Sequence, residues 1–128
     1  MKQVIQNYNN KFYKYVSSYD LNDNNLLRKM IHSYEVARNC FSIASREGMN
    51  EKQRNFCYLM GLFHDIGRFK QWQIYHTYDD AKSVDHGDLS CDMLDEFDYE
   101  KLFGFSKVEY NLLKESIKFH NFLILTVC

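Results

Sequence analysis

The stretch FCYLMGLFHDIGRFKQW, residues 56–72, places two good metal-ligand residue types side by side at the end of an apolar segment. Apolar side chains recur at helical spacing up to Phe63, and His64 and Asp65 follow directly. Neighbouring residues on a regular helix point about 100° apart, so this pair can share one ion only where the helix ends. We expect Gly67 to form the turn there, because glycine reaches positive φ without a steric penalty.

The apolar spacing is helical along almost the whole chain, and no segment sustains the alternation typical of a strand. Residues 2–18 and 26–46 carry two helical patterns, and a third runs from Asn50 up to the His64-Asp65 pair. Residues 86–97 carry another, and one more begins at Ser106. A short helix and a long loop fill the interval after Gly67. The sequence therefore predicts an all-α bundle of about six helices.

Capping signals mark several of the helix ends. Asn50 is followed three residues later by Gln53, and Ser106 by Glu109, which is the capping-box pattern. Gly48 lies where a left-handed cap would end the preceding helix. These signals divide the helices without any proline.

Composition excludes several classes of function. The 128 residues include 16 basic and 17 acidic side chains, and the net charge of −1 argues against a dedicated nucleic-acid surface. No apolar stretch approaches the roughly 18 residues of a membrane span. The four cysteines form no CxxC pair, as is typical of reduced proteins. We expect a single domain over residues 1–128 that is cytoplasmic and has no membrane partner.

The histidines are the main candidates for metal binding. His32, His64, His86 and His120 each lie at an expected helix terminus or on an inward stripe, and Asp65 adds a carboxylate. Neutral imidazoles with a carboxylate suit a divalent transition metal. Spacing alone leaves a second reading open, in which the histidines are hydrogen-bonded core residues and Asp65 caps the next helix.

Four segments carry a resemblance to a known family. MIHSYEVAR (30–38), GLFHDIGRFKQ (61–71), DDAKSVDHG (79–87) and SIKFHN (116–121) occur in this order. Together they resemble the HD superfamily, which consists of all-helical metal-dependent phosphohydrolases named for their His-Asp pair. The likeness covers about residues 26–121, and HDIGRF followed by SVDHG is most similar to the small bacterial members. Residues 1–18 would then form an N-terminal helix packed on this HD core.

The resemblance implies a ligand set and a reaction. His32, His64 and Asp65 would bind a first ion, and Asp65 would bridge to a second ion held by His86 and His120. The cofactor would be one or two divalent ions of Mn, Fe, Co, Ni, Zn or Mg. Asp65 would be catalytic, and water activated by the metal would hydrolyse a small phosphorylated metabolite or a nucleotide.

This chain also departs from the family pattern. The family has a further aspartate ligand on a later helix, whereas this chain ends eight residues after His120, in NFLILTVC. We therefore expect a C-terminally shortened member whose apolar end, residues 121–128, favours self-association. Two alternatives follow: a domain that binds metal or nucleotide without hydrolysing it, and a di-iron oxygenase like some relatives.

Other residues are candidates for substrate binding. Arg68 follows the His-Asp pair, and its guanidinium can hold a phosphate bidentately or form an ordinary ion pair. Lys82, His76 and Tyr78 lie in the expected long loop, which either lines the site or remains solvated. We assign catalytic or substrate-binding roles to Arg68 and substrate-binding roles to Lys82 and His76.

The aspartates before His86 have two readings each. Asp85 can orient the imidazole of His86 from behind or cap the helix that follows. Asp79, Asp80 or Asp85 could replace the missing family aspartate, and we expect that none of them does.

Overall fold

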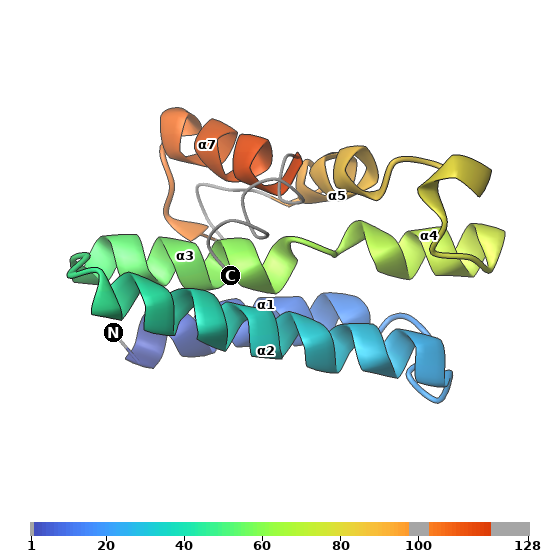
Figure 1. Ribbon diagram of the computed structural model, residues 1–128, viewed down its shortest axis with the longest axis horizontal. Coiled ribbons are helices and arrows are strands. Elements are labelled where there is room, and N and C mark those ends of the chain that lie inside the picture. The colour runs from blue at the N-terminus through green and yellow to red at the C-terminus, as the bar shows by residue number, and fades with distance from the viewer. Residues whose placement is uncertain (1, 98–102, 119–128) are drawn as a thin grey trace.

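The computed structural model describes residues 2–97 and 103–118, and this part of the chain is almost entirely helical (Figure 1). No strand occurs within these two ranges, which confirms the predicted all-α fold. The helices are α1 (Lys2–Val16), α2 (Asn24–Arg46), α3 (Glu51–Phe63), α4 (Gly67–Tyr75), α5 (His86–Leu94) and α7 (Lys107–Lys118), with a 3₁₀ helix η1 (Asp80–Lys82) before α5.

The helices form three layers. In Figure 1, α3 and α4 follow one another through the middle of the molecule, with α1 and α2 on one side and α5 and α7 on the other. The main packing partners agree with this view: α2 packs on α3, α4 on α5, and α5 on α7. The junction between α3 and α4 therefore lies between α2 and α5.

Aromatic side chains anchor this junction in the core. Phe63, the last residue of α3, and Phe69 in α4 are both fully buried. The ring of Phe12 from α1 lies 5.5 Å from that of Phe63 and 6.2 Å from that of Phe69, both edge to face. Such pairs add to the free energy gained from burial alone. Phe63 and Phe69, which flank His64 and Asp65 in the sequence, are thus held firmly in the core.

The predicted caps are present. Asn50 Oδ1 accepts from Gln53 N at 2.9 Å, and Gln53 Oε1 accepts from Asn50 N at 3.0 Å. Ser106 and Glu109 form the same reciprocal pair at 3.1 and 3.2 Å. Gly48 has a φ of 73°, the left-handed value expected of it.

Two helices end earlier than the apolar pattern predicts. α1 stops at Val16, two residues before the expected end, because the hydroxyl of Ser18 donates instead to Tyr15 O at 2.7 Å. α5 stops at Leu94 rather than at residue 97. There the backbone tightens into a turn in which Phe97 N bonds Leu94 O at 3.0 Å. In both cases local hydrogen bonds override the apolar periodicity.

Two expectations concern the C-terminal residues, and a third concerns membranes. His120, expected to be a metal ligand, and residues 121–128, expected to favour self-association, lie outside the described residues. Within the described ranges, no helix combines the length and apolar character needed to cross a membrane.

Candidate metal centre

The His-Asp pair lies at the junction between α3 and α4. His64 follows the last turn of α3 with φ −59° and ψ −32°, and Ile66 has φ −58° and ψ −30°. The backbone thus keeps near-helical angles through the junction. His64 Nε2 nevertheless lies 3.2 Å from Asp65 Oδ2, so the two adjacent side chains do converge.

Gly67 has a different role from the predicted one. Positive φ among the described glycines occurs at Gly48 and Gly104, so the prediction for Gly67 is wrong. A Cβ on Gly67 would lie 2.6 Å from His86 O and 2.7 Å from Ser90 N. Its N–H donates to Ser90 Oγ at 2.8 Å. Glycine therefore lets α4 touch α5, and this contact brings His86 to the site.

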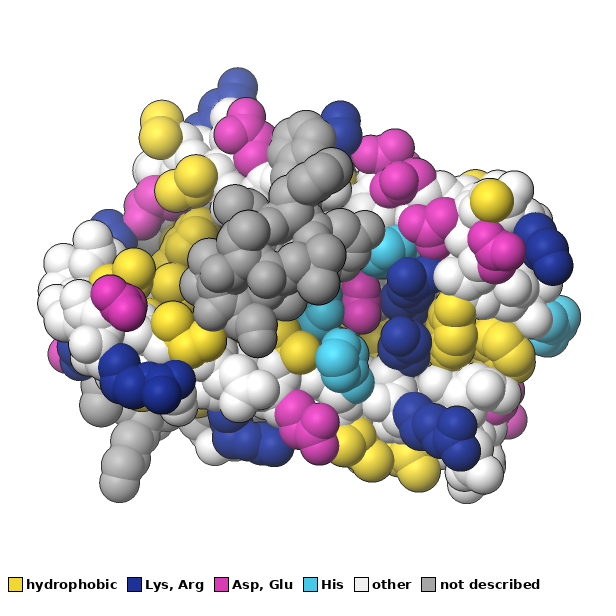
Figure 2. Space-filling model, in the orientation of Figure 1, with side chains coloured by type: hydrophobic (Ala, Val, Ile, Leu, Met, Phe, Trp, Pro, Cys, Tyr) yellow, Lys and Arg dark blue, Asp and Glu magenta, His cyan; other side chains and the backbone are white. Residues whose placement is uncertain are grey.

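Three imidazoles surround the carboxylate of Asp65. The Nε2 atoms of His32 and His64 lie 3.9 and 3.2 Å from Asp65 Oδ2, and that of His86 lies 3.4 Å from Oδ1. Potential ligand atoms of His32, His64 and Asp65 all lie within 4.8 Å of one another. His64, Asp65 and His86 are buried, whereas 48% of the His32 side chain is exposed. Figure 2 shows histidine, acidic and basic side chains gathered on this face.

Two imidazoles of the site are held by hydrogen bonds at Nδ1. His64 Nδ1 lies 2.5 Å from Gly61 O, and since a carbonyl only accepts, Nδ1 carries the hydrogen. His86 Nδ1 lies 2.7 Å from Asp80 Oδ2 in the same way. Both Nε2 atoms face the Asp65 carboxylate, and each of these contacts is favourable with either a proton or a metal cation between nitrogen and oxygen. His32, His64 and Asp65, whose ligand atoms lie close enough to share one ion, therefore fit a divalent transition metal.

Asp80 orients His86 and ties it to α4. Its Oδ2 also accepts from the backbone N–H of His86 at 3.2 Å. Its Oδ1 accepts from Arg68 Nη1 at 2.9 Å and from Gln71 Nε2 at 3.0 Å. Burial raises the pKa of Asp80, but the hydrogen bonds from His86 and Gln71 outweigh it, and the pKa lies below its usual range. Asp80 thus remains a carboxylate that supports His86 from behind.

Asp85 takes the second of its two expected roles. Its side chain accepts from Asp88 N at 2.9 Å and caps α5. The position that could orient His86 is already occupied by Asp80, whose carboxylate contacts both the ring and the backbone of His86. Sequence order therefore pointed to the neighbouring aspartate, whereas the fold uses one six residues away.

Protonation differs between the imidazoles. Burial lowers the pKa of His86, but its hydrogen bonds to Asp65 and Asp80 outweigh this and leave the pKa above the usual 6.5. Burial holds the pKa of His32 below 6.5. His32 is thus neutral at pH 7, and a neutral imidazole is the form that binds metal.

Lys29 belongs to the site, and the sequence reasoning missed it. Its Nζ lies 4.0 Å from Asp65 Oδ2. Burial lowers the pKa of Lys29, the charge of Asp65 opposes this, and the charge of Arg68 adds to it. Lys29 precedes His32 by three residues on α2, and residues at that spacing lie on the same helix face. This spacing is the sequence signal that could have predicted Lys29 as a residue of the site.

The predicted substrate-binding residues lie at different depths. Arg68 is beside the site: its Nε is 4.0 Å from Asp65 Oδ1, and its Nη1 donates to Gln71 Oε1, Tyr78 O and Asp80 Oδ1. Lys82 is exposed in η1. His76 is exposed at the end of α4, where it adopts a φ of 54°. The substrate roles of these three residues remain predictions.

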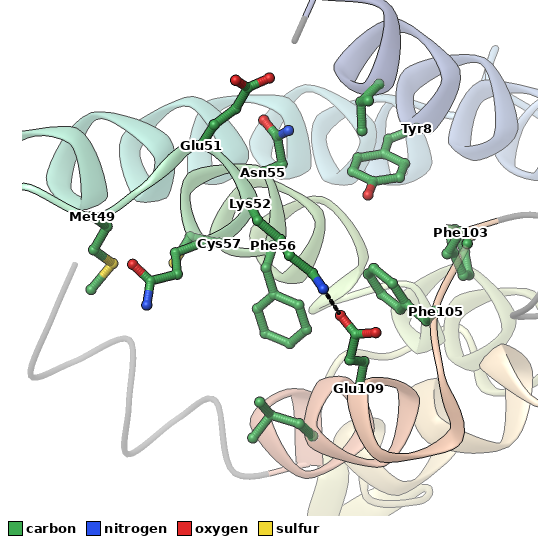
Figure 3. A pocket seen from close by; sticks show the side chains of 14 residues that line it. Tyr8, Met49, Glu51, Lys52, Asn55, Phe56, Cys57, Phe103, Phe105 and Glu109 are labelled. Carbon is green, nitrogen blue, oxygen red and sulfur yellow. Dashed lines mark ion pairs between the residues drawn. The ribbon is translucent and has the colours of Figure 1, made fainter.

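A separate apolar cavity of about 750 Å³ lies at the opposite end of α3 (Figure 3). Its lining includes Tyr8, Phe56 and Phe105, and an ion pair of 3.0 Å joins Lys52 Nζ to Glu109 Oε2 there. None of its lining residues is a histidine. The metal-ligand candidates therefore lie elsewhere.

A family model supports what this geometry suggests. The model of the HD domain matches residues 30–126, which span His32, the His64-Asp65 pair and His86. The chain belongs to the HD domain family. HD domains are metal-dependent domains of the phosphohydrolase type, and they bind divalent metal ions. No curated protein and no solved structure matches this HD domain.

Proposed function

We propose that this HD domain is a metal-dependent phosphohydrolase that acts on a small phosphorylated metabolite or a nucleotide. The observation that carries the proposal is the pair of imidazoles whose Nδ1 atoms are engaged and whose Nε2 atoms face the buried carboxylate of Asp65. His32, His64 and Asp65 would hold one divalent ion, and Asp65 would share a second ion with His86 and His120. Such an ion lowers the pKa of a water molecule and polarises a phosphoryl oxygen.

The side chains around the ligands suit an anionic substrate. Asp65 and His64 are buried, so their positions are fixed by the core before any ligand arrives. His32 is half exposed and lies at the rim, where a substrate would approach. Arg68 and Lys29 supply positive charge on two sides of the Asp65 carboxylate. Asp80 keeps the ring of His86 in the orientation that a ligand needs.

The test is release of phosphate from a panel of phosphomonoesters and nucleotides by protein reconstituted with manganese, iron or nickel. We expect metal-dependent hydrolysis of at least one substrate by the wild type and none by Asp65→Ala, which lacks the central ligand. Retained metal-dependent hydrolysis in Asp65→Ala would contradict the mechanism. Metal-dependent stabilisation with no hydrolysis at all would favour the alternative of a domain that only binds metal or nucleotide.

A further inference from the structure

A lysine, a tyrosine ring and an arginine stack beside Asp65. Lys29 Nζ lies 4.8 Å from the centre of the Tyr78 ring, and the guanidinium carbon of Arg68 lies 5.8 Å from the same ring. Both cations also approach Asp65, each at 4.0 Å. Three segments meet here, because Lys29 is in α2, Arg68 in α4, and Tyr78 in the loop that leads to η1. The stack therefore forms one wall of the metal centre.

The two cations differ in how firmly they are engaged. Arg68 Nη1 makes three hydrogen bonds of 2.7 to 2.9 Å to Gln71, Tyr78 and Asp80, so this side chain fastens the loop to α4. The Lys29 ammonium makes no hydrogen bond to a side chain of the described residues; it lies near the Asp65 carboxylate and over the Tyr78 ring. Its side chain is 24% exposed, against 16% for Arg68. Lys29 thus has ammonium donors to offer a ligand.

The Tyr78 ring is held firmly enough to position Lys29. The Tyr78 hydroxyl donates to Asn25 O in the first turn of α2 at 2.7 Å. The ring also packs against Trp72 with 5.0 Å between centres, and Trp72 Nε1 donates to Asp23 Oδ2 at 2.9 Å. A lysine side chain loses rotamer entropy when a ligand fixes it. Contact with a fixed ring places the ammonium near the site in advance.

The local charges define the ligand that this wall suits. Lys29 and Arg68 are balanced by Asp65 and Asp80, to which they lie close. A divalent ion at Asp65 would give these groups an excess of about two positive charges. A phosphate monoester carries roughly −1.5 to −2 at neutral pH. The excess charge therefore matches a phosphate monoester better than a singly charged diester.

We propose that Lys29 binds the phosphoryl group of a phosphate monoester and that the Tyr78 ring is its positioning residue. This inference rests on the proposed function and assigns that function a substrate class. Arg68 holds the loop and supplies charge from its Nε side, whereas Lys29 makes the direct hydrogen bonds to phosphate. The Tyr78 hydroxyl serves the fold, and the face of its ring serves Lys29.

The test measures binding of inorganic phosphate by isothermal titration calorimetry to manganese-loaded protein. Charge-assisted hydrogen bonds contribute about 1.5–3 kcal/mol, so Lys29→Met should weaken phosphate binding about 10- to 150-fold. Lys29→Arg should lose less affinity than Lys29→Met, because it keeps the charge and can still donate hydrogen bonds to phosphate. Lys107→Met, which removes the same charge from an exposed position on α7, should bind phosphate as the wild type does. Melting temperatures confirm that each variant is folded.

A double-mutant cycle tests the positioning role of Tyr78. Tyr78→Leu removes the ring and should weaken phosphate binding about 3- to 10-fold, whereas Tyr78→Phe keeps the ring and its packing on Trp72 and should weaken binding less than Tyr78→Leu does. In the Lys29→Met background, Tyr78→Leu should have no further effect on phosphate binding. An equal loss in both backgrounds would overturn the positioning role of the ring.

Two outcomes separate this inference from the proposed function. If Lys29→Met binds phosphate as tightly as the wild type, or if Lys29→Arg loses as much affinity as Lys29→Met, the role of Lys29 is overturned even when hydrolysis is observed. If phosphate binding depends on Lys29 but no phosphomonoester is hydrolysed, hydrolysis fails while the phosphate site stands. Wild-type protein that binds no phosphate in the presence of manganese would overturn the inference itself.

Discussion

The two ends of α3 differ in what fills the space beside them. At the C-terminal end, side chains from α2, α4, α5 and the junction between α3 and α4 converge on the buried carboxylate of Asp65. At the N-terminal end, aromatic residues such as Phe56 and Phe105 line an apolar cavity of about 750 Å³, and the charges are exposed at its edge. Burial of titratable groups, rather than cavity volume, therefore marks the candidate metal centre.

The largest expected difference between the two ends is in metal binding. Metal at a thousand times its dissociation constant should stabilise the wild type by about 4 kcal/mol. Asp65→Ala should lose this increment entirely, because it removes the carboxylate shared by the imidazoles. Denaturant unfolding with manganese and with a chelator measures the increment. Lys52→Met, at the apolar end, is the control and should keep it; an equal loss in both variants would erase the distinction.

The apolar end should contribute to stability without affecting the metal. Phe105 is 8% exposed and lines the cavity, so Phe105→Ala should lower the free energy of unfolding by about 3 kcal/mol. The metal-dependent increment should remain at the wild-type value. Urea unfolding at fixed manganese concentration tests both statements. A variant with changed manganese affinity would mean that the two ends are coupled.

Loss of the hydrogen bond by which Asp80 orients His86 should have an intermediate effect, on manganese affinity. Asp80→Asn removes the charge that orients His86 and should weaken manganese binding about 10- to 100-fold. Asp85→Asn is the matched control, because asparagine caps a helix about as well as aspartate does. Calorimetric titration with manganese compares the two variants. If Asp85→Asn weakened binding as much as Asp80→Asn, Asp85 would be the residue that supports His86.

The smallest expected effect is on the pH dependence of stability, through the ion pair between Lys52 and Glu109 at the apolar end. The hydrogen bond from Lys52, followed by that from the Ser106 backbone, holds the pKa of Glu109 below its usual 4.5. Its contribution to stability is therefore complete above pH 4.5 and is lost as the pH falls through the lower folded pKa. Glu109→Gln keeps the capping box but removes the charge.

Unfolding measured between pH 6 and about pH 3 checks this ion pair. The wild type should lose slightly more stability than Glu109→Gln as the pH falls. A steeper loss of stability in Glu109→Gln would reverse the sign and contradict the account of this end.

Local signals were sufficient to predict the helices. The capping boxes at Asn50 and Ser106 fixed two helix starts, and Gly48 fixed an end, because each signal acts within a few residues. The ends of α1 and α5 were placed two and three residues too far along. There the apolar pattern continues into residues whose own hydrogen bonds end the helix.

Non-local contacts were harder to predict. The sequence predicted that His32, His64 and His86 lie close to Asp65, because the family motifs include all three. The support of His86 by Asp80 depends on how the loop folds back over α4, which no local pattern encodes. Gly67 was predicted to adopt positive φ, whereas it is needed for the close contact between α4 and α5. That contact cannot be predicted from the residues next to Gly67 in the sequence.

The most direct test of the central claim is metal stoichiometry, measured by inductively coupled plasma mass spectrometry on protein purified without added metal. The account predicts about one or two transition-metal ions per chain in the wild type and none in Asp65→Ala. An absence of bound metal in the wild type, even after incubation with manganese, iron or nickel, would contradict it.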